Sequence, residues 1–187
     1  LSEMIKNYEM IKDHEANLKQ FLLELENADN SWPNMNWVKV SGLNSIYILK
    51  LNRADLDSDT HLHYCGYVGV PKSHPYYDKI DCMGGNMFFR EMESQLFTNE
   101  SIDVDVHGGV TYTGGMDGWR KDYFFIGFDS AHMMDACTTE ELKDFPFTSS
   151  FKPWSYMKKQ VFNLYKQLEQ VESNALISTS INKENHQ

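Results

Sequence analysis

The stretch "DYFFIGFDS", Asp122 to Ser130, decides the fold, because it is apolar enough to form a central strand of a sheet. Other segments upstream also have the composition of strands, with turn-forming residues between them. Their ranges are 37–40, 45–52, 62–71 and 101–112. Strands that follow one another in sequence usually pair, so these segments predict a mostly antiparallel sheet.

Two long helices are predicted on either side of the strands. Residues 2–27 and 153–171 carry apolar side chains at three- and four-residue spacing, the pattern of an amphipathic helix. Pro153 suits the first turn of the second helix. Shorter helices are expected over 86–97 and after Thr138, which begins a capping box.

This order of elements predicts an α+β fold, with the long N- and C-terminal helices packed on one face of the sheet. We expect a single domain over residues 1–172, because 187 residues are close to the usual size of one domain. Residues 173–187 are rich in Asn, Ser and Lys, and we expect a flexible tail there.

Composition limits the class of function. The chain has 17 basic and 27 acidic residues, a net charge of −10, and no cluster of Lys and Arg interleaved with aromatics. Duplex binding depends on basic residues that release counterions, so nucleic-acid binding through a broad basic surface is disfavoured. An acidic surface also disfavours anionic membranes, and no apolar run approaches the roughly 18 residues of a membrane span. The three cysteines form no CxxC pair, which favours a reducing, cytoplasmic location.

Two stretches, "VHGGVTY" (Val106–Tyr112) and "GFDSAHMMD" (Gly127–Asp135), each carry a histidine where a predicted strand breaks into a turn. Because sequential strands usually pair, we predict that His107 and His132 lie within about 10 Å of each other. The two stretches therefore predict a polar pocket at the ends of neighbouring strands.

The residues around the histidines have the chemistry of such a pocket. Gly108 and Gly109 free the backbone from ordinary φ/ψ limits and permit close approach of a ligand, while Thr111 and Tyr112 add hydroxyls. Asp129, His132 and Asp135 are spaced three apart, so a single turn brings them to one side. A carboxylate there can cap the turn and fix the tautomer of a histidine.

The pocket hypothesis gives each residue a role. His107 and His132 are the acid/base pair, since histidine titrates near neutrality, and Asp129 orients one of them. The expected ligand-binding residues are His74, Gly108, Gly109, Thr111, Tyr112 and Asp135. His and Asp side chains also suit zinc or manganese, so a metal in the pocket is left open. The structural alternative is an exposed polar row with a β-bulge, an N-capping Asp129, histidines satisfied within the core and His74 in a surface loop.

The stretch "HLHYC" (His61–Cys65) has a second metal-binding pattern. On a strand His61, His63 and Cys65 would point to one face, and H-x-H is a known zinc spacing. No closed set of four ligands is visible, and His61 is expected in the preceding loop. The sequence therefore disfavours zinc at this place.

The motifs "CGYVGVP" with His74-Pro75, "VHGGVTY", and "GFDSAH" with Asp135 resemble, in order and spacing, a family found in bacteriophages, prophages and some bacterial genomes. The resemblance covers residues 64–170. Members of that family usually have a cysteine where Ser130 stands and a glycine near Met134, so no role for a thiol in that turn is carried over. The resemblance implies a phage-borne protein in the host cytoplasm and supplies no established reaction.

Two functional hypotheses follow from different classes. Phages gain from proteins that bind or destroy the nucleotide signals of host defence, so the first is a pocket that binds, and as a hydrolase cleaves, a small phosphorylated or nucleotide-like ligand in counter-defence. The second is an acidic inhibitor that binds a host defence protein directly, since a net charge of −10 can compete with nucleic acid for basic clefts.

Overall fold

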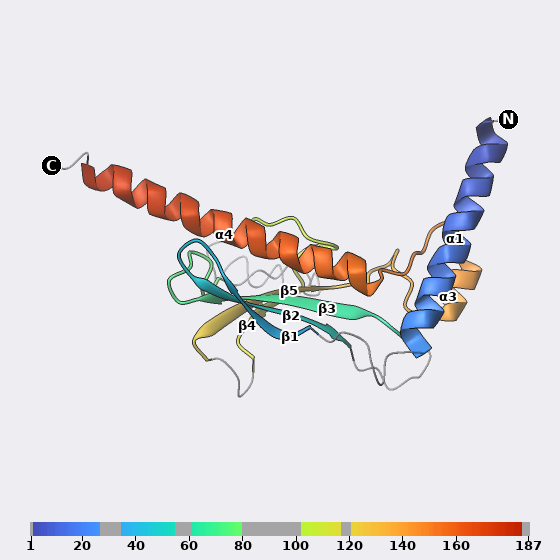
Figure 1. Cartoon of the computed structure of the whole chain (residues 1–187), viewed down its shortest axis with the longest axis horizontal. Coiled ribbons are helices and arrows are strands. Elements are labelled where there is room, and N and C mark those ends of the chain that lie inside the picture. The colour runs from blue at the N-terminus through green and yellow to red at the C-terminus, as the bar shows by residue number, and fades with distance from the viewer. Residues whose placement is uncertain (1, 27–34, 55–60, 80–101, 117–120, 185–187) are drawn as a thin grey trace, which may run out of the picture.

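The computed structural model describes residues 2–26, 35–54, 61–79, 102–116 and 121–184. Within these residues a five-stranded sheet has the order β1-β2-β3-β5-β4, and every neighbouring pair is antiparallel (Figure 1). The strands are β1 (Met35–Ser41), β2 (Ile46–Arg53), β3 (Tyr64–Pro71), β4 (Tyr112–Gly114) and β5 (Tyr123–Asp129). The helices are α1 (Ser2–Glu26), α3 (Thr139–Asp144) and α4 (Trp154–Glu184). The predicted α+β class is confirmed, and the "DYFFIGFDS" stretch forms the interior strand β5.

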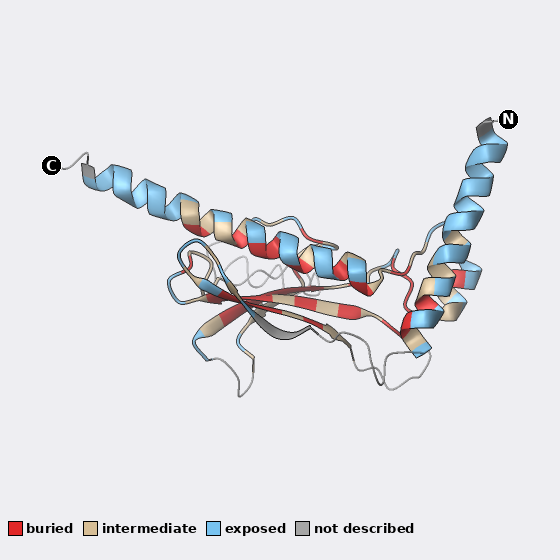
Figure 2. Ribbon diagram, viewed as in Figure 1, coloured by how far each residue is buried: buried red, intermediate tan, exposed pale blue. Residues whose placement is uncertain are grey.

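Helix α4 lies across one face of the sheet and closes the core (Figure 2). Its fully buried side chains recur at three- and four-residue spacing: Met157, Val161, Leu164 and Leu168. Burial of each such side chain contributes roughly 1.5–3 kcal/mol. The helix packs tightly against the sheet at Gly66, where an added β-carbon would lie 2.7 Å from the Val161 side chain. Only a residue without a side chain permits this distance between helix and strand.

Helix α1 meets the rest of the molecule through its C-terminal half, and its N-terminal half projects away from the sheet (Figures 1 and 2). Phe21 is fully buried and packs edge-on against Phe151, with ring centroids 5.0 Å apart. The buried Glu24 carboxylate accepts hydrogen bonds from the Tyr64 hydroxyl at 2.8 Å and the Trp154 backbone N–H at 3.1 Å. Trp154 is the first residue of α4, so Glu24 places a negative charge where the helix dipole favours one.

The strand predicted over 101–112 is wrong except at its end, because only Tyr112–Gly114 pair with β5. Residues 102–111 instead run irregularly alongside α4 (Figure 1). The Gln167 side chain accepts from the Asp105 N–H and donates to the Asp105 carbonyl, both at 2.7 Å, and Gln160 accepts from the His107 N–H at 3.1 Å. Side chains of α4 therefore make the backbone hydrogen bonds that a neighbouring strand was expected to make with this segment.

The end of α4 and the start of α3 can be compared with the sequence-based expectations. Helix α4 continues to Glu184, so the expected flexible tail from residue 173 is helical to that point, and residues 174–183 are exposed. The capping box at Thr138 is present, with Glu141 as its partner at the start of α3. The helix expected over 86–97 lies outside the described residues. Neither long helix has the apolar length that a membrane crossing demands, as far as the described residues extend.

Candidate functional site

The two histidine-bearing stretches meet at one end of the sheet, where β5 ends. The Asp129 carboxylate accepts from the backbone N–H of Ala131 at 2.9 Å and so starts a tight turn, which the hydrogen bond from Asp135 N–H to the His132 carbonyl continues at 2.8 Å. A second turn is closed by the Gly109 N–H, which donates to the Val106 carbonyl at 2.9 Å. Together these turns face His107 toward the segment that carries His132 and Asp135.

The centre of the site is the carboxylate of Asp135, whose side chain is only 3% exposed. One of its oxygens, Oδ2, accepts from His107 Nε2 at 2.8 Å and from His132 Nδ1 at 3.1 Å. The other oxygen lies 3.5 Å from the Lys152 amine. Burial alone would raise the pKa of Asp135, but the hydrogen bonds from His107 and His132 outweigh that effect and hold the pKa below its usual value. Asp135 therefore remains a carboxylate and fixes both imidazoles.

The two imidazoles lie with ring centroids 5.5 Å apart and nearly perpendicular, which confirms the predicted proximity of His107 and His132. Gly108 makes this arrangement possible. Its φ is +68°, and an added β-carbon would lie 2.0 Å from the His132 ring. The glycine expected to allow close approach of a ligand instead allows close approach of His132.

The second ring nitrogen of His107 bonds a residue that sequence reasoning missed. His107 Nδ1 lies 3.1 Å from the hydroxyl of Tyr156, on α4. Because a carboxylate only accepts, His107 Nε2 carries the proton shared with Asp135, and in the neutral ring Nδ1 accepts from Tyr156. Burial and the charge of Asp135 raise the pKa of Tyr156, so its hydroxyl keeps its proton. The result is a hydrogen-bonded chain from Tyr156 through His107 to Asp135.

Asp129 does not have the orienting position that was predicted for it. Its Oδ1 lies 3.9 Å from His132 Nδ1, beyond hydrogen-bond distance, while Asp135 reaches the same nitrogen at 3.1 Å. The other oxygen of Asp129 accepts from the Thr111 hydroxyl at 2.8 Å. Asp135, expected to bind ligand, is thus the residue that orients the histidines, and Thr111 binds Asp129.

The structure places two other predicted ligand-binding residues elsewhere. His74 is buried, and both ring nitrogens are taken by backbone groups, Nε2 by the Leu168 carbonyl at 2.7 Å and Nδ1 by the Tyr76 N–H at 3.0 Å. It is a core residue and not a surface loop residue. Tyr112 packs edge-on against Tyr67 with ring centroids 5.5 Å apart, and its hydroxyl donates to the Gly115 carbonyl. Gly109 has φ +83°, consistent with a turn, and no atom lies within 4 Å of an added β-carbon.

A cleft of about 620 Å³ opens beside His107 and Asp135, between α1 and the segment 146–152. Its polar lining includes Asp13, His14, Asn17, Thr148, Ser149, Ser150 and Lys152. His132 is not part of the lining; its ring packs against Gly108, and its side chain is 31% exposed outside the cleft, against 15% for His107. A ligand bound in this cleft therefore meets His107 and not His132.

No family model, curated protein or solved structure matches this chain. The resemblance to a phage family therefore remains a prediction carried by the three motifs. The features that support a function for this chain are the His107–Asp135 pair and the cleft beside it.

Proposed function

We propose that the chain binds a small phosphorylated or nucleotide-like ligand in the cleft beside His107, and that His107 acts as the acid/base group in its hydrolysis. The observation that carries the proposal is the buried Asp135 carboxylate, bonded to His107 at 2.8 Å in the wall of a cleft that also holds Lys152. In a phage-borne protein, as the resemblance predicts, this function would serve counter-defence.

The chemistry of the cleft supports an anionic ligand despite the acidic chain. The Lys152 amine and the His14 imidazole are charged or chargeable donors, and the hydroxyls of residues 148–150 add neutral donors. Ammonium and hydroxyl groups are common partners of phosphate oxygens. The Lys152 amine lies 3.5 Å from the Asp135 carboxylate, which holds it in place. A bound phosphate would interact with this same amine.

The acid/base role follows from the hydrogen-bonded chain. His107 Nδ1 is the basic ring atom, because Nε2 is committed to Asp135. In hydrolysis the Tyr156 hydroxyl passes its proton to this atom and takes one from the attacking water as the water oxygen bonds to phosphorus. The leaving oxygen then takes the proton from His107 as its bond to phosphorus breaks. Asp135 stabilises the transient imidazolium, and the Tyr156 hydroxyl at 3.1 Å can relay the proton. His132 is a positioning residue that holds Asp135.

The test separates binding from chemistry. Binding of nucleoside mono- and diphosphates and cyclic nucleotides is measured by calorimetry, with inorganic phosphate as reference, and turnover by phosphate release. Lys152→Gln should weaken binding about tenfold or more, while Lys143→Gln, an exposed lysine on α3, should bind like the parent. His107→Gln should bind but turn over about 10²–10⁴-fold more slowly. Equal turnover by His107→Gln and the parent would exclude the acid/base role.

One observation favours the alternative, an acidic inhibitor that binds a host defence protein directly. The N-terminal half of α1 exposes a row of apolar side chains, Met4, Ile5, Tyr8 and Ile11, on a chain of net charge −10. Under this alternative the double variant Ile5→Ser/Tyr8→Ser should no longer protect phage from host defence in an infection assay. The same double variant should leave protection intact if the cleft is the functional site, because neither residue lines it.

A further inference from the structure

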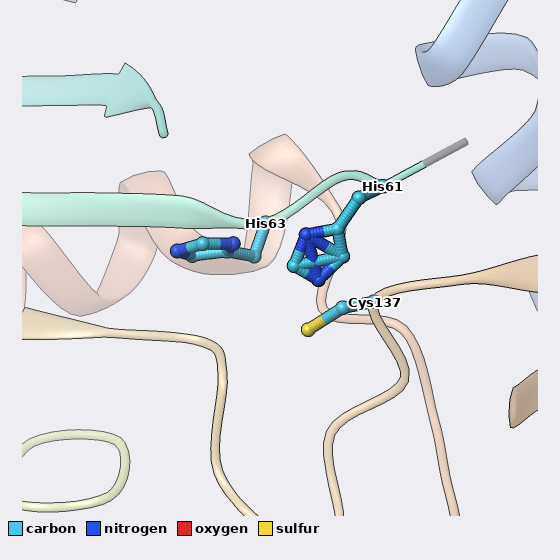
Figure 3. A group of neighbouring side chains, drawn as sticks. All are labelled: His61, His63 and Cys137. Atoms are coloured by element: carbon cyan, nitrogen blue, oxygen red, sulfur yellow. The ribbon is translucent and has the colours of Figure 1, made fainter. Parts of the chain in front are cut away.

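A second group of potential metal ligands includes Cys137 of the residue 130–138 segment, and no part of the proposed function uses it. His61 Nδ1 or Nε2, a ring nitrogen of His63 and the sulfur of Cys137 all lie within 4.8 Å of one another. Figure 3 shows the two imidazoles on the chain that leads into β3 and the Cys137 side chain on the neighbouring segment. We propose that His61, His63 and Cys137 bind a Zn²⁺ ion.

The backbone explains why these residues meet. Beyond the last register pair of β3 and β5, the two chains stay side by side, with an isolated bridge between His61 and Thr138 and a hydrogen bond from Leu62 N–H to the Cys137 carbonyl at 2.8 Å. In an extended chain alternate side chains share a face, so His61 and His63 point the same way while Leu62 enters the core. The sequence pattern had grouped Cys65 with these histidines, and the structure brings Cys137 there instead.

The ligand set and its spacing suit zinc. Two imidazoles and a thiolate are nitrogen and sulfur donors of the kind that zinc prefers. Around a tetrahedral zinc ion, ligand atoms lie roughly 3.3–3.7 Å apart, so separations within 4.8 Å require side-chain shifts of only about 1 Å. Among the described residues no fourth His, Cys, Asp or Glu joins the group. Three protein ligands leave one coordination position for water or for a ligand group, as in open zinc sites.

His63 supplies an independent observation. Its Nδ1 atom is buried and has no hydrogen-bond partner. A buried polar atom without a partner destabilises the fold unless a ligand or metal ion binds to it. In a neutral imidazole such a nitrogen can offer its lone pair to a metal ion. Both imidazoles are only half-buried, which leaves a path for a metal ion to enter.

The charges around Cys137 favour a cation. Burial, together with the charges of Glu141, Asp135 and Asp129, raises the pKa of the Cys137 thiol to about 12. Without metal the thiol is protonated and donates to the Ser130 carbonyl at 3.5 Å. When zinc binds, the zinc–sulfur bond replaces the S–H bond and the thiol proton passes to solvent. The nearby carboxylates disfavour a free thiolate. Once the thiolate is bound to Zn²⁺, the same carboxylates stabilise the positive charge of the ion.

The comparison with the His107 site makes the assignment specific. There Asp135 already accepts hydrogen bonds from both imidazoles, and of the ring nitrogens only His132 Nε2 is left without a partner. No hydrogen bond or ion pair links the side chains of His61, His63 and Cys137, all of which the structure describes. Of the two groups, the one containing Cys137 therefore lacks an internal substitute for a metal ion.

The experiment uses the full chain, stripped with a chelator and dialysed against Zn²⁺, with bound zinc measured by mass spectrometry. We expect about one zinc per chain, and with Co²⁺ a thiolate-to-cobalt charge-transfer band. Cys137→Ser and His63→Gln should lower zinc affinity more than about a hundredfold, since loss of a second-shell partner alone costs about 10–100-fold. Cys65→Ser and His107→Gln are the matched controls and should bind like the parent.

The serine in Cys137→Ser can still donate to the Ser130 carbonyl, so this variant should fold, and circular dichroism checks that it does. His61→Gln, at a half-buried residue, is the second variant if Cys137→Ser unfolds. Zinc uptake that is absent in the parent, or that Cys137→Ser retains in full, overturns the proposal. Loss of zinc in His107→Gln but not in Cys137→Ser also overturns it, because the metal would then belong to the His107 site.

Discussion

The imidazole of His132 rests directly on the backbone of Gly108, so that a β-carbon at Gly108 would lie 2.0 Å from the ring. Gly109, the next residue, also has a positive φ, but an added β-carbon there would meet no atom within 4 Å. The two glycines therefore differ in what a side chain would encounter, although they share a backbone conformation.

This pair gives a first prediction. Gly109→Ala should cost about 1 kcal/mol of unfolding free energy, because only the left-handed conformation is penalised. Gly108→Ala carries the same penalty and must also displace the His132 ring, so it should cost about 3 kcal/mol or more. Denaturant unfolding of both variants measures the difference. Equal losses would mean that the ring moves away without cost.

A second prediction concerns the two carboxylates of the site. Asp135→Asn should destabilise the fold by about 3 kcal/mol or more, because it leaves buried donors of two imidazoles and Lys152 without a charged acceptor. Asp129→Asn should cost less than about 1 kcal/mol, since an amide oxygen can still accept from Ala131 N–H. Thermal melting ranks the two variants, and a larger loss at Asp129 would contradict the central position of Asp135.

A third prediction is a pH dependence caused by His74. Burial lowers the pKa of His74 below its usual value of 6.5, although the Leu168 carbonyl and the charge of Glu172 act in the opposite direction. The unfolded chain therefore takes up a proton before the folded chain does, and stability falls as the pH drops below about 6.5. His74→Gln should flatten this slope in unfolding curves taken between about pH 7.5 and about pH 5. An unchanged slope would show that His74 does not contribute to it.

A fourth prediction tests how α1 is attached. Glu24→Ala removes the acceptor of the Tyr64 hydroxyl and the carboxylate at the N-terminus of α4, so we expect a loss of about 3 kcal/mol or more. Glu26→Ala changes an exposed carboxylate two residues away and should stay within about 0.5 kcal/mol of the parent. Chemical unfolding measures both, and similar losses would argue against the capping role of Glu24.

Much of the fold could be predicted because its signals are local. The spacing of Met157, Val161 and Leu164 marks a buried helix face, and the apolar run in β5 marks an interior strand. The strand over 101–112 failed because its alternation also fits a chain whose backbone bonds are made by Gln160 and Gln167, more than 50 residues away. No local pattern distinguishes a partner strand from a row of helix side chains.

The site was predictable to a similar extent. Proximity of His107 and His132 was predicted from strand pairing and is confirmed, although His107 lies in a turn and not at the end of a strand. Tyr156 and Cys137 were missed because each reaches its histidines from a segment that the sequence gives no reason to place there. The choice between Asp129 and Asp135 was also beyond the sequence, since both lie three residues from His132 and only the turn geometry separates them.

The reliance of residues 105–107 on glutamine side chains of α4 has a consequence for the order of folding. The bond between Asp105 and Gln167 spans 62 residues, so it can form only after α4 has docked on the sheet. The partner of Asp105 is a side chain of α4, so the bond depends on the position of that helix and not on residues near Asp105. The sheet and α4 can therefore collapse around Val161 and Leu164 first, while the turn bearing His107 still exchanges its amide protons freely with solvent. The wall of the cleft is then a late-forming part of the native state, and it is the first part to be lost when α4 lifts away.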